Sequence, residues 1–97
     1  MPTPLTIIAT ARAKRGLEAL MIAEQIKLVE ATRQSPGCIR YELHVSNQEP
    51  GLVTFVEQWQ SEALWQQHLN GKYVEHFRTV AGHCIGEFEL HKMHQVA

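Results

Sequence analysis

The sequence has no surplus of charge of either sign and very little cysteine, and each shortage argues against a class of function. Lys and Arg number 9 against 10 Asp and Glu, so the formal net charge is -1 with histidine neutral. A phosphate backbone is bound by a basic surplus, so we expect no nucleic-acid partner. The two cysteines, Cys38 and Cys84, have neither metal-ligand nor redox-pair spacing, and we expect them to be reduced thiols.

Long apolar runs are also missing. No stretch approaches the roughly 20 residues that cross a bilayer, so we expect no membrane partner. Residues 1–6 lack the charged start and apolar core of a secretory signal, which makes a cytoplasmic location our expectation. The 97 residues predict one domain, residues 1–97. A chain this short buries only about 60–65 % of its unfolded surface, so it gains from a partner subunit.

Alternating apolar residues predict four strands, over residues 5–13, 38–45, 52–59 and 85–93. The polar turn at 46–51 has hairpin length, so the second and third strands should pair antiparallel. In the second strand, alternation places Ile39, Tyr41, Leu43 and Val45 on one face and Cys38 on the other. In the third, one face carries Val53, Phe55, Glu57 and Trp59.

Helical patterns fill the gaps between these strands. Residues 17–33 contain no helix breaker and carry two apolar stripes, so one stripe should meet the sheet and the other a helix, a pocket or a second subunit. The first stripe comprises Ala19, Ile22, Ala23, Ile26 and Val29, and the second comprises Leu17, Leu20, Met21, Leu28 and Ala31. Glu24 lies in the second stripe, either at its edge, which we favour, or facing a cavity. Ser61 is a good N-cap for a helix ending near Leu69, and Asn70-Gly71, a stop able to adopt left-handed geometry, separates it from a helix over 72–81.

The element order is strand, helix, strand, strand, broken helix, strand. This order predicts an α+β class of the split βαβ, ferredoxin-like type, a βαββαβ antiparallel sheet with its helices on one face. The first strand carries apolar residues on both of its sides, including Ile7 and Ile8. The helix-free face therefore needs a cover, and a second copy of the same sheet would supply it, which predicts a homodimer.

Four stretches carry a family resemblance in this order: residues 11–16, residues 35–44 around Pro36-Gly37-Cys38, the run 57–59 (Glu-Gln-Trp), and His68. At these intervals the chain resembles the antibiotic biosynthesis monooxygenase domain family over nearly its whole length. The resemblance implies a dimeric α/β barrel with a pocket in each subunit between sheet and helices. It also implies cofactor-independent oxidation of aromatics, in which a deprotonated phenol reacts with molecular oxygen and needs neither metal nor flavin.

Two branches of that family fit this sequence only in part. A haem-degrading branch uses an Asn, a Trp and a His at positions that here are Ala9, His68 and Arg78, so we expect no haem degradation. A polyketide-oxidising branch uses an Asn, a Trp, an Arg and a Tyr. Of these, Trp59 matches, and Trp65 stands near the place of the Tyr.

His68 is our candidate catalytic residue, because an imidazole with a pKa near 6.5 can deprotonate a phenol or enol. The alternative is a helix histidine that is hydrogen-bonded to the sheet or exposed. Glu57 lies on an otherwise apolar face and needs a partner there. We favour a structural role, in which it orients an Arg or His, over that of a pocket acid.

The remaining candidates are substrate-binding residues. Trp59 and Trp65 could wall an aromatic substrate, although Trp59 is more typical of a core residue. Tyr41 should pack with its hydroxyl at the pocket edge. Tyr73 and His76 could line the entrance, although a solvated or core role is more typical of such residues. The histidines have no metal-ligand spacing, so we predict no metal site and no cofactor.

These patterns lead to one function and two rivals. The first is a cofactor-independent monooxygenase acting with molecular oxygen on a small aromatic, quinol-like or polyketide-like compound. The second is a non-catalytic dimer that binds a small molecule. The third is an isomerase or lyase of an enolisable metabolite, such as a quorum-signal derivative, which needs a base but no oxygen. Fold alone does not separate them.

Overall fold

A computed structural model describes residues 3–97, so Met1 and Pro2 of the N-terminal segment lie outside the described residues. Its strands are β1 (Leu5–Ala13), β2 (Cys38–Val45), β3 (Leu52–Trp59) and β4 (Ile85–Met93). Its helices are α1 (Glu18–Thr32), α2 (Glu62–Leu69), α3 (Lys72–Ala81) and the short 3-10 helix η1 (Gly82–Cys84).

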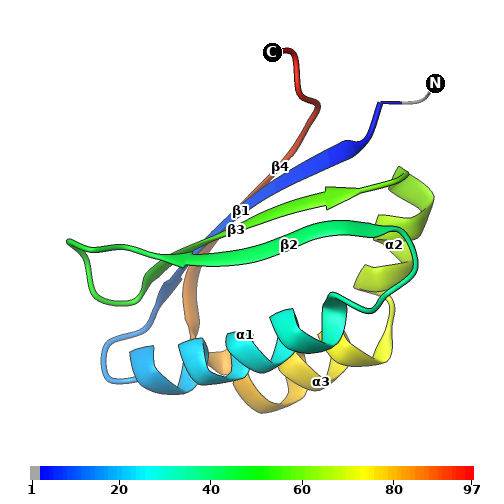
Figure 1. Cartoon of the computed structure of the whole chain (residues 1–97). Helices are drawn as coiled ribbons and strands as arrows, with labels where there is room; N and C mark the ends of the chain where they lie inside the picture. Colours follow the sequence, from blue (N-terminus) through cyan, green and yellow to red (C-terminus); the bar gives the residue numbers. More distant parts are fainter. Residues whose placement is uncertain (1–2) are drawn as a thin grey trace.

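The four strands form one antiparallel sheet in the order β2-β3-β1-β4. Figure 1 shows α1 and α3 side by side across one face of this sheet, with α2 at one end. The βαββααβ order and the single helical layer confirm the ferredoxin-like α+β prediction. Among residues 3–97, none of the helices is long and apolar enough to cross a membrane. The cytoplasmic location stays a prediction.

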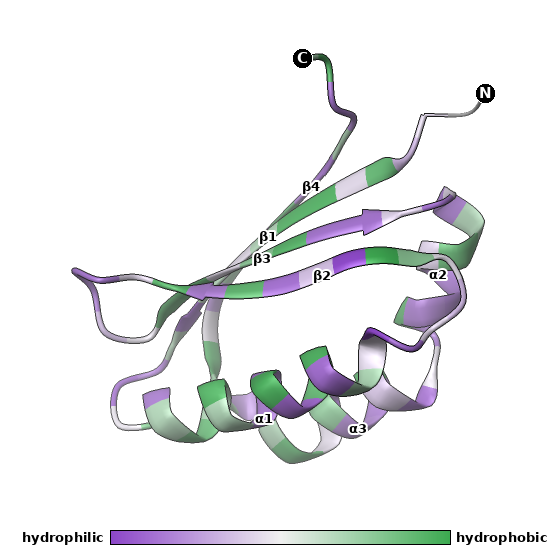
Figure 2. Ribbon diagram, in the orientation of Figure 1, coloured by the Kyte–Doolittle hydropathy of each residue, from purple (hydrophilic) through white to green (hydrophobic). Residues whose placement is uncertain are grey.

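The third strand has the faces that alternation predicts. Val53, Phe55, Glu57 and Trp59 are buried, while the residues between them are half-buried on the helix-free side. Figure 2 shows apolar and polar residues alternating along the strands. Because side chains in a strand alternate between faces, Glu57 faces the helices together with the apolar core.

The second strand departs from its predicted alternation. A register shift between Cys38 and Arg40 leaves Ile39 without a pairing partner, so Ile39 is 49 % exposed. Cys38 pairs with Trp59 and packs against the buried cluster, on the same side as Tyr41. The predicted faces of Cys38 and Ile39 were therefore wrong, because an extra residue in one strand reverses the alternation on one side of the bulge.

The buried face of α1 differs from both predicted stripes. Its buried residues are Met21 and Leu28 from one stripe, Val29 from the other, and the polar residues Gln25 and Thr32, which belong to neither. Glu24 lies at an edge, as expected, where its carboxylate accepts a hydrogen bond from Lys27 Nζ at 3.2 Å.

The residues just before and just after α2 determine where this helix begins and ends. Ser61 Oγ accepts a hydrogen bond from the Leu64 N–H at 3.2 Å, which confirms the predicted N-cap. The helix ends at Asn70, but Asn70 and Gly71 have φ values of -95° and -88°, so the predicted left-handed stop was wrong. A hydrogen bond from the Gly71 N–H to the His68 carbonyl, at 3.0 Å, closes the turn before α3.

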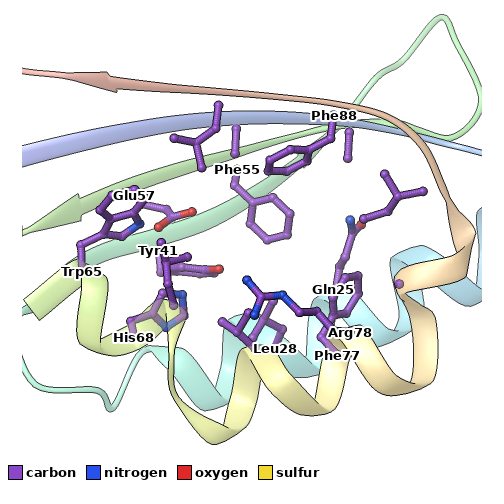
Figure 3. A pocket seen from close by; sticks show the side chains of 17 residues that line it. Gln25, Leu28, Tyr41, Phe55, Glu57, Trp65, His68, Phe77, Arg78 and Phe88 are labelled. Atoms are coloured by element: carbon purple, nitrogen blue, oxygen red, sulfur yellow. The ribbon is translucent and has the colours of Figure 1, made fainter.

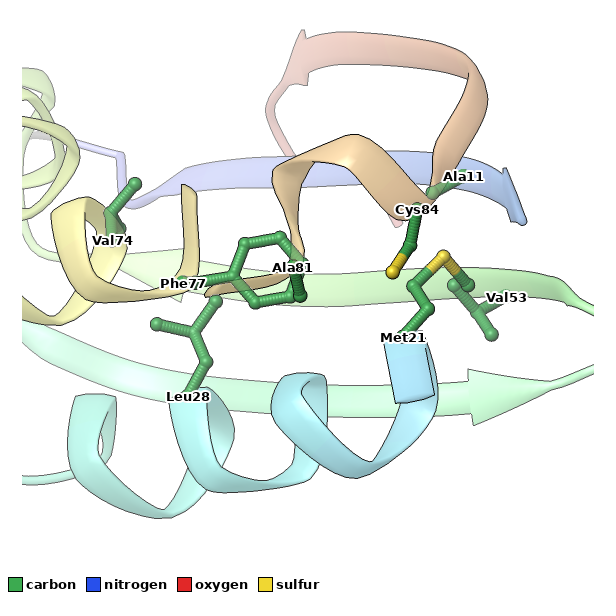
Figure 4. Close-up of a cluster of buried hydrophobic side chains, with 8 residues drawn as sticks. All are labelled: Ala11, Met21, Leu28, Val53, Val74, Phe77, Ala81 and Cys84. Carbon is green, nitrogen blue, oxygen red and sulfur yellow. The ribbon is translucent and has the colours of Figure 1, made fainter. Parts of the chain in front are cut away.

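Two groups of buried side chains fill the layer between sheet and helices. The apolar cluster, drawn in Figure 4, comprises Ala11, Met21, Leu28, Val53, Val74, Phe77, Ala81 and Cys84. The aromatic cluster comprises Ile7, Ala9, Val29, Tyr41, Phe55, Trp59 and Trp65.

Candidate functional site

A cavity of about 410 Å³ lies where the apolar and aromatic clusters meet, with walls from the sheet, α1, α2 and α3. Its walls are mainly large apolar side chains, while a few polar groups converge on it (Figure 3). Cavities of this size and composition are typical of sites for small organic molecules. The apolar part of the wall includes Leu28, Phe55, Trp65, Phe77, Phe88 and Leu90.

His68 projects from α2 into this cavity and is 8 % exposed. Its ring stacks on Trp59, with centroids 4.8 Å apart, and meets the edge of Tyr41 at 5.4 Å. Burial lowers the pKa of His68 from 6.5 to about 4, because the charged imidazolium is poorly solvated there. The ring is therefore neutral at pH 7, with a nitrogen able to accept a proton.

Glu57 comes from the centre of the sheet and lines the same end of the cavity. Burial raises the pKa of Glu57 from 4.5 to about 7, although the Trp59 Nε1–H donates to Glu57 Oε1 at 2.9 Å and opposes that rise. The expected partner, an Arg or His, was wrong, because the tryptophan indole takes that place. Near pH 7 the carboxyl therefore exchanges its proton readily.

The other predicted site residues are distributed unequally. Tyr41 and Trp65 line the cavity and are 5 % and 4 % exposed. Trp59 is fully buried beneath the His68 ring and lies outside the cavity wall. Tyr73 and His76 are exposed and line a separate hollow between α1 and α3 with Glu24, so the structure does not bring them to the cavity. Tyr73 and His68 also line a hollow on the outer side of α2.

Burial also raises the pKa values of two groups near Glu57, Tyr41 and Cys38. The pKa of Tyr41 is raised well above 10, first by burial and then by the Glu57 charge. The same two causes, in the same order, raise the pKa of the Cys38 thiol. Both groups are therefore protonated at neutral pH, and the Tyr41 hydroxyl is a hydrogen-bond donor.

Sequence reasoning named Tyr41, Glu57, Trp65 and His68 but missed the rest of the wall, including its two other polar side chains, Gln25 and Arg78. Gln25 follows Met21 by four residues and precedes Leu28 by three, a spacing that could have placed it on the buried face of α1. Arg78 similarly follows Val74 by four. Among residues 3–97, no three His, Cys, Asp or Glu side chains lie close enough together to hold a metal ion.

The sheet, its single helical layer and the mainly apolar cavity between them define a ferredoxin-like domain with a cavity of small-molecule size. The chain belongs to the antibiotic biosynthesis monooxygenase family, whose model matches residues 4–80. That match includes β1 to β3, α1, α2 and most of α3, and so nearly all of the cavity wall except its β4 side.

Individual proteins are also similar to this chain in sequence and structure. Protein PA3566 from Pseudomonas aeruginosa is 29 % identical, with a TM-score of 0.94 over 100 % of this chain and 98 % of that one. Protein SO0527 from Shewanella oneidensis is 33 % identical, with a TM-score of 0.88 over 96 % and 91 %. The uncharacterized protein sll1783 of Synechocystis sp. is 26 % identical over 74 residues, which are 76 % of this chain. The match spans only 50 % of that relative's length.

Proposed function

We propose that this protein is a cofactor-independent monooxygenase that oxidises a small aromatic, quinol-like compound with molecular oxygen. One observation carries the proposal: Glu57 and His68 line the same end of a cavity with aromatic walls. At pH 7 each can accept a proton there. Membership of a family of monooxygenases supports the reaction class.

The reaction needs only the substrate and oxygen. Removing a proton from a quinol gives an electron-rich phenolate, which can pass electrons to oxygen directly. One oxygen atom then enters the ring and the other leaves as water, so a quinol and O₂ give a hydroxyquinone and H₂O. The quinol supplies all four electrons. The protein therefore has to orient the ring, take the proton and keep the reactive intermediate away from bulk water.

The two ionisable groups differ as proton acceptors. A phenol has a pKa of about 10, so transfer to Glu57 spans about 3 units and transfer to His68 about 6. At about 1.4 kcal/mol per unit, the Glu57 transfer is easier by about 4 kcal/mol in the empty cavity. We therefore propose that Glu57 takes the proton and that His68, our original candidate base, contacts the substrate hydroxyl and orients it.

Oxygen consumption tests both the reaction and these roles. The parent should consume oxygen with a member of a panel of reduced quinones and polyphenols, along an ascending pH limb near 7. Glu57→Gln should remove the limb. His68→Ala should lower turnover by about 10²-fold but keep the ascending pH limb. If His68 is the base instead, Glu57→Gln will keep the pH profile. Tight ligand binding without oxygen uptake would support the non-catalytic dimer, and solvent-proton exchange without oxygen uptake would support the isomerase.

We also propose that the working form is a homodimer joined through the helix-free face of the sheet. Ile8 of β1 and Val56 of β3 are paired neighbours there, and both are only half-buried. A second sheet would cover them, as an antiparallel sheet with apolar residues on both faces requires. Sedimentation at micromolar concentration should find a dimer. A stable folded monomer would contradict this assembly.

A further inference from the structure

The cavity contains two polar side chains that the proposed chemistry does not use. Gln25 of α1 is 1 % exposed, and its Oε1 has no hydrogen-bond partner among the described residues. Arg78 of α3 lines the same cavity and takes part in no ion pair within residues 3–97. In Figure 3 the Gln25 amide points into the cavity on the side away from Glu57, and the Arg78 guanidinium extends into the middle of the cavity, between Gln25 and His68.

The buried amide oxygen indicates what a ligand must supply. A buried acceptor without a partner lowers stability, and folded proteins rarely keep one unless it serves a ligand or water. Gln25 Oε1 can only accept, so its partner must carry an O–H or N–H. On a compound whose ring is oxidised at the other end of the cavity, a second hydroxyl would fill this position.

The guanidinium indicates a second feature. Arginine remains charged at every physiological pH and presents a fork of donors that matches a carboxylate. Glu57, the other charged group of the wall, is directed to its Trp59 partner, and its pKa is raised by burial rather than lowered by a nearby cation. The charge of Arg78 therefore stays available to an anionic ligand.

We propose that Gln25 and Arg78 form a specificity subsite, and that the preferred substrate is a hydroxylated aromatic carboxylate. Its carboxylate pairs with Arg78, a hydroxyl donates to Gln25 Oε1, and the hydroxyl to be deprotonated faces Glu57 and His68. Arg78 is exposed at the wall of the cavity, so the carboxylate keeps contact with water while the ring is buried. The inference rests on the proposed function, because it names the substrate class for the same cavity.

Binding of three compounds that are not quinols tests the subsite without requiring turnover. 4-Hydroxy-2-naphthoate carries both groups, 1-naphthol lacks the carboxylate, and 2-naphthoate lacks the hydroxyl. Calorimetric titration of the full-length protein should give a Kd for 4-hydroxy-2-naphthoate at least about fivefold below that of 1-naphthol. Fivefold is the contribution expected of a partly solvated ion pair.

Single-residue variants assign this preference to individual side chains. Arg78→Met should reduce the preference over 1-naphthol to within about twofold, whereas Arg15→Met, in the exposed loop after β1, should leave it unchanged. With its carboxylate on Arg78, the single hydroxyl of 4-hydroxy-2-naphthoate should bind Gln25, so its preference over 2-naphthoate should fall in Gln25→Leu and remain in Glu57→Gln. Arg78→Lys, which keeps the charge, should retain most of the carboxylate preference.

The outcomes separate this inference from the proposed function. Equal affinities for 4-hydroxy-2-naphthoate and 1-naphthol in the parent, or a preference that survives Arg78→Met, would overturn the subsite even if neutral quinols are oxidised. A carboxylate preference that depends on Arg78, in a protein that consumes no oxygen with any quinol, would leave the subsite standing and reject the monooxygenase.

Discussion

The apolar cluster and the aromatic cluster meet at one cavity but bury different chemistry. The apolar cluster packs Met21, Val53 and Ala81 to within 1 % of full burial and contains no carboxyl or imidazole group. The aromatic cluster surrounds Glu57 and His68, whose charged forms burial disfavours. Packing alone can stabilise the first region, whereas stability in the second depends on protonation. Reactivity and reduced stability therefore lie in the same half of the core.

The largest expected effect comes from removing the central side chain of each cluster. Trp59→Ala should lower the free energy of unfolding by about 3–5 kcal/mol and Met21→Ala by about 2–5 kcal/mol, because both side chains are fully buried. Only Trp59→Ala should depend on pH. Above pH 7 the ionised Glu57 also loses its indole donor, at an added cost of about 1–3 kcal/mol.

Chemical denaturation of both variants at pH 5 and pH 8 makes this comparison. Met21→Ala should lose the same stability at the two pH values and so serves as the packing control. If Trp59→Ala also behaves identically at pH 5 and pH 8, the aromatic cluster is held by packing alone and the contrast between the clusters disappears.

The next effect is the pH dependence of stability, to which Glu57 and His68 contribute with opposite sign. The folded pKa of Glu57, about 7, exceeds its ordinary 4.5, so its contribution falls as pH rises from 4.5 to 7, by about 3 kcal/mol at most. The folded pKa of His68, about 4, is below its ordinary 6.5, so its contribution falls as pH drops from 6.5 to 4. Between pH 4.5 and 6.5 the two slopes oppose each other.

Single variants should reveal each slope. In Glu57→Gln, stability should rise more steeply with pH between 4 and 6.5 than in the parent, because His68 acts unopposed. In His68→Asn, stability should fall more steeply between 4.5 and 7. Urea denaturation across this range measures both. Parallel curves for the parent and both variants would show that folding changes the pKa of neither Glu57 nor His68.

The smallest effect tests the close contact between α2 and the turn that precedes β2. Gly37 precedes β2 with φ +80°, and an added Cβ would approach Leu64 Cδ1 of α2 to 2.5 Å. Gly16 has a similar φ of +88° but no atom within 4 Å, so it is a matched control for backbone strain. Gly37→Ala should be less stable than Gly16→Ala by about 1 kcal/mol or more, because only Gly37→Ala also displaces α2. Equal melting temperatures would mean that α2 adjusts freely.

Strand alternation and helix breakers were enough to predict the fold. Those signals are local in the sequence. The structure shows them in the strict alternation of β3 and in the Ser61 cap of α2. The bulge at Ile39 escaped prediction because Cys38 and Ile39 are both apolar, so neither face stands out in the sequence. The buried face of α1 was also missed, since Gln25 and Thr32 are polar and are buried only by tertiary packing.

The candidate site was predicted in part. Glu57, Tyr41, Trp65 and His68 come from three separate elements, and their meeting at one cavity follows from the ferredoxin-like topology. No single candidate residue in the sequence shows which face of α3 is turned toward the sheet. Val74, Phe77 and Ala81 turn inward and are buried, which carries Tyr73 and His76 outward and brings Arg78 to the cavity.

The strand order also decides when the cavity can form during folding. The β2–β3 hairpin closes a six-residue turn, so it can form in microseconds. The central strand β1 can pair with β3 at once, but its other edge must wait for β4, whose Phe88 pairs with Ala11 from far along the sequence. Ile85, Phe88 and Leu90 of that late strand close one wall of the cavity. During synthesis the hairpin and the helices can therefore form first, and the cavity is completed only after β4 has left the ribosome.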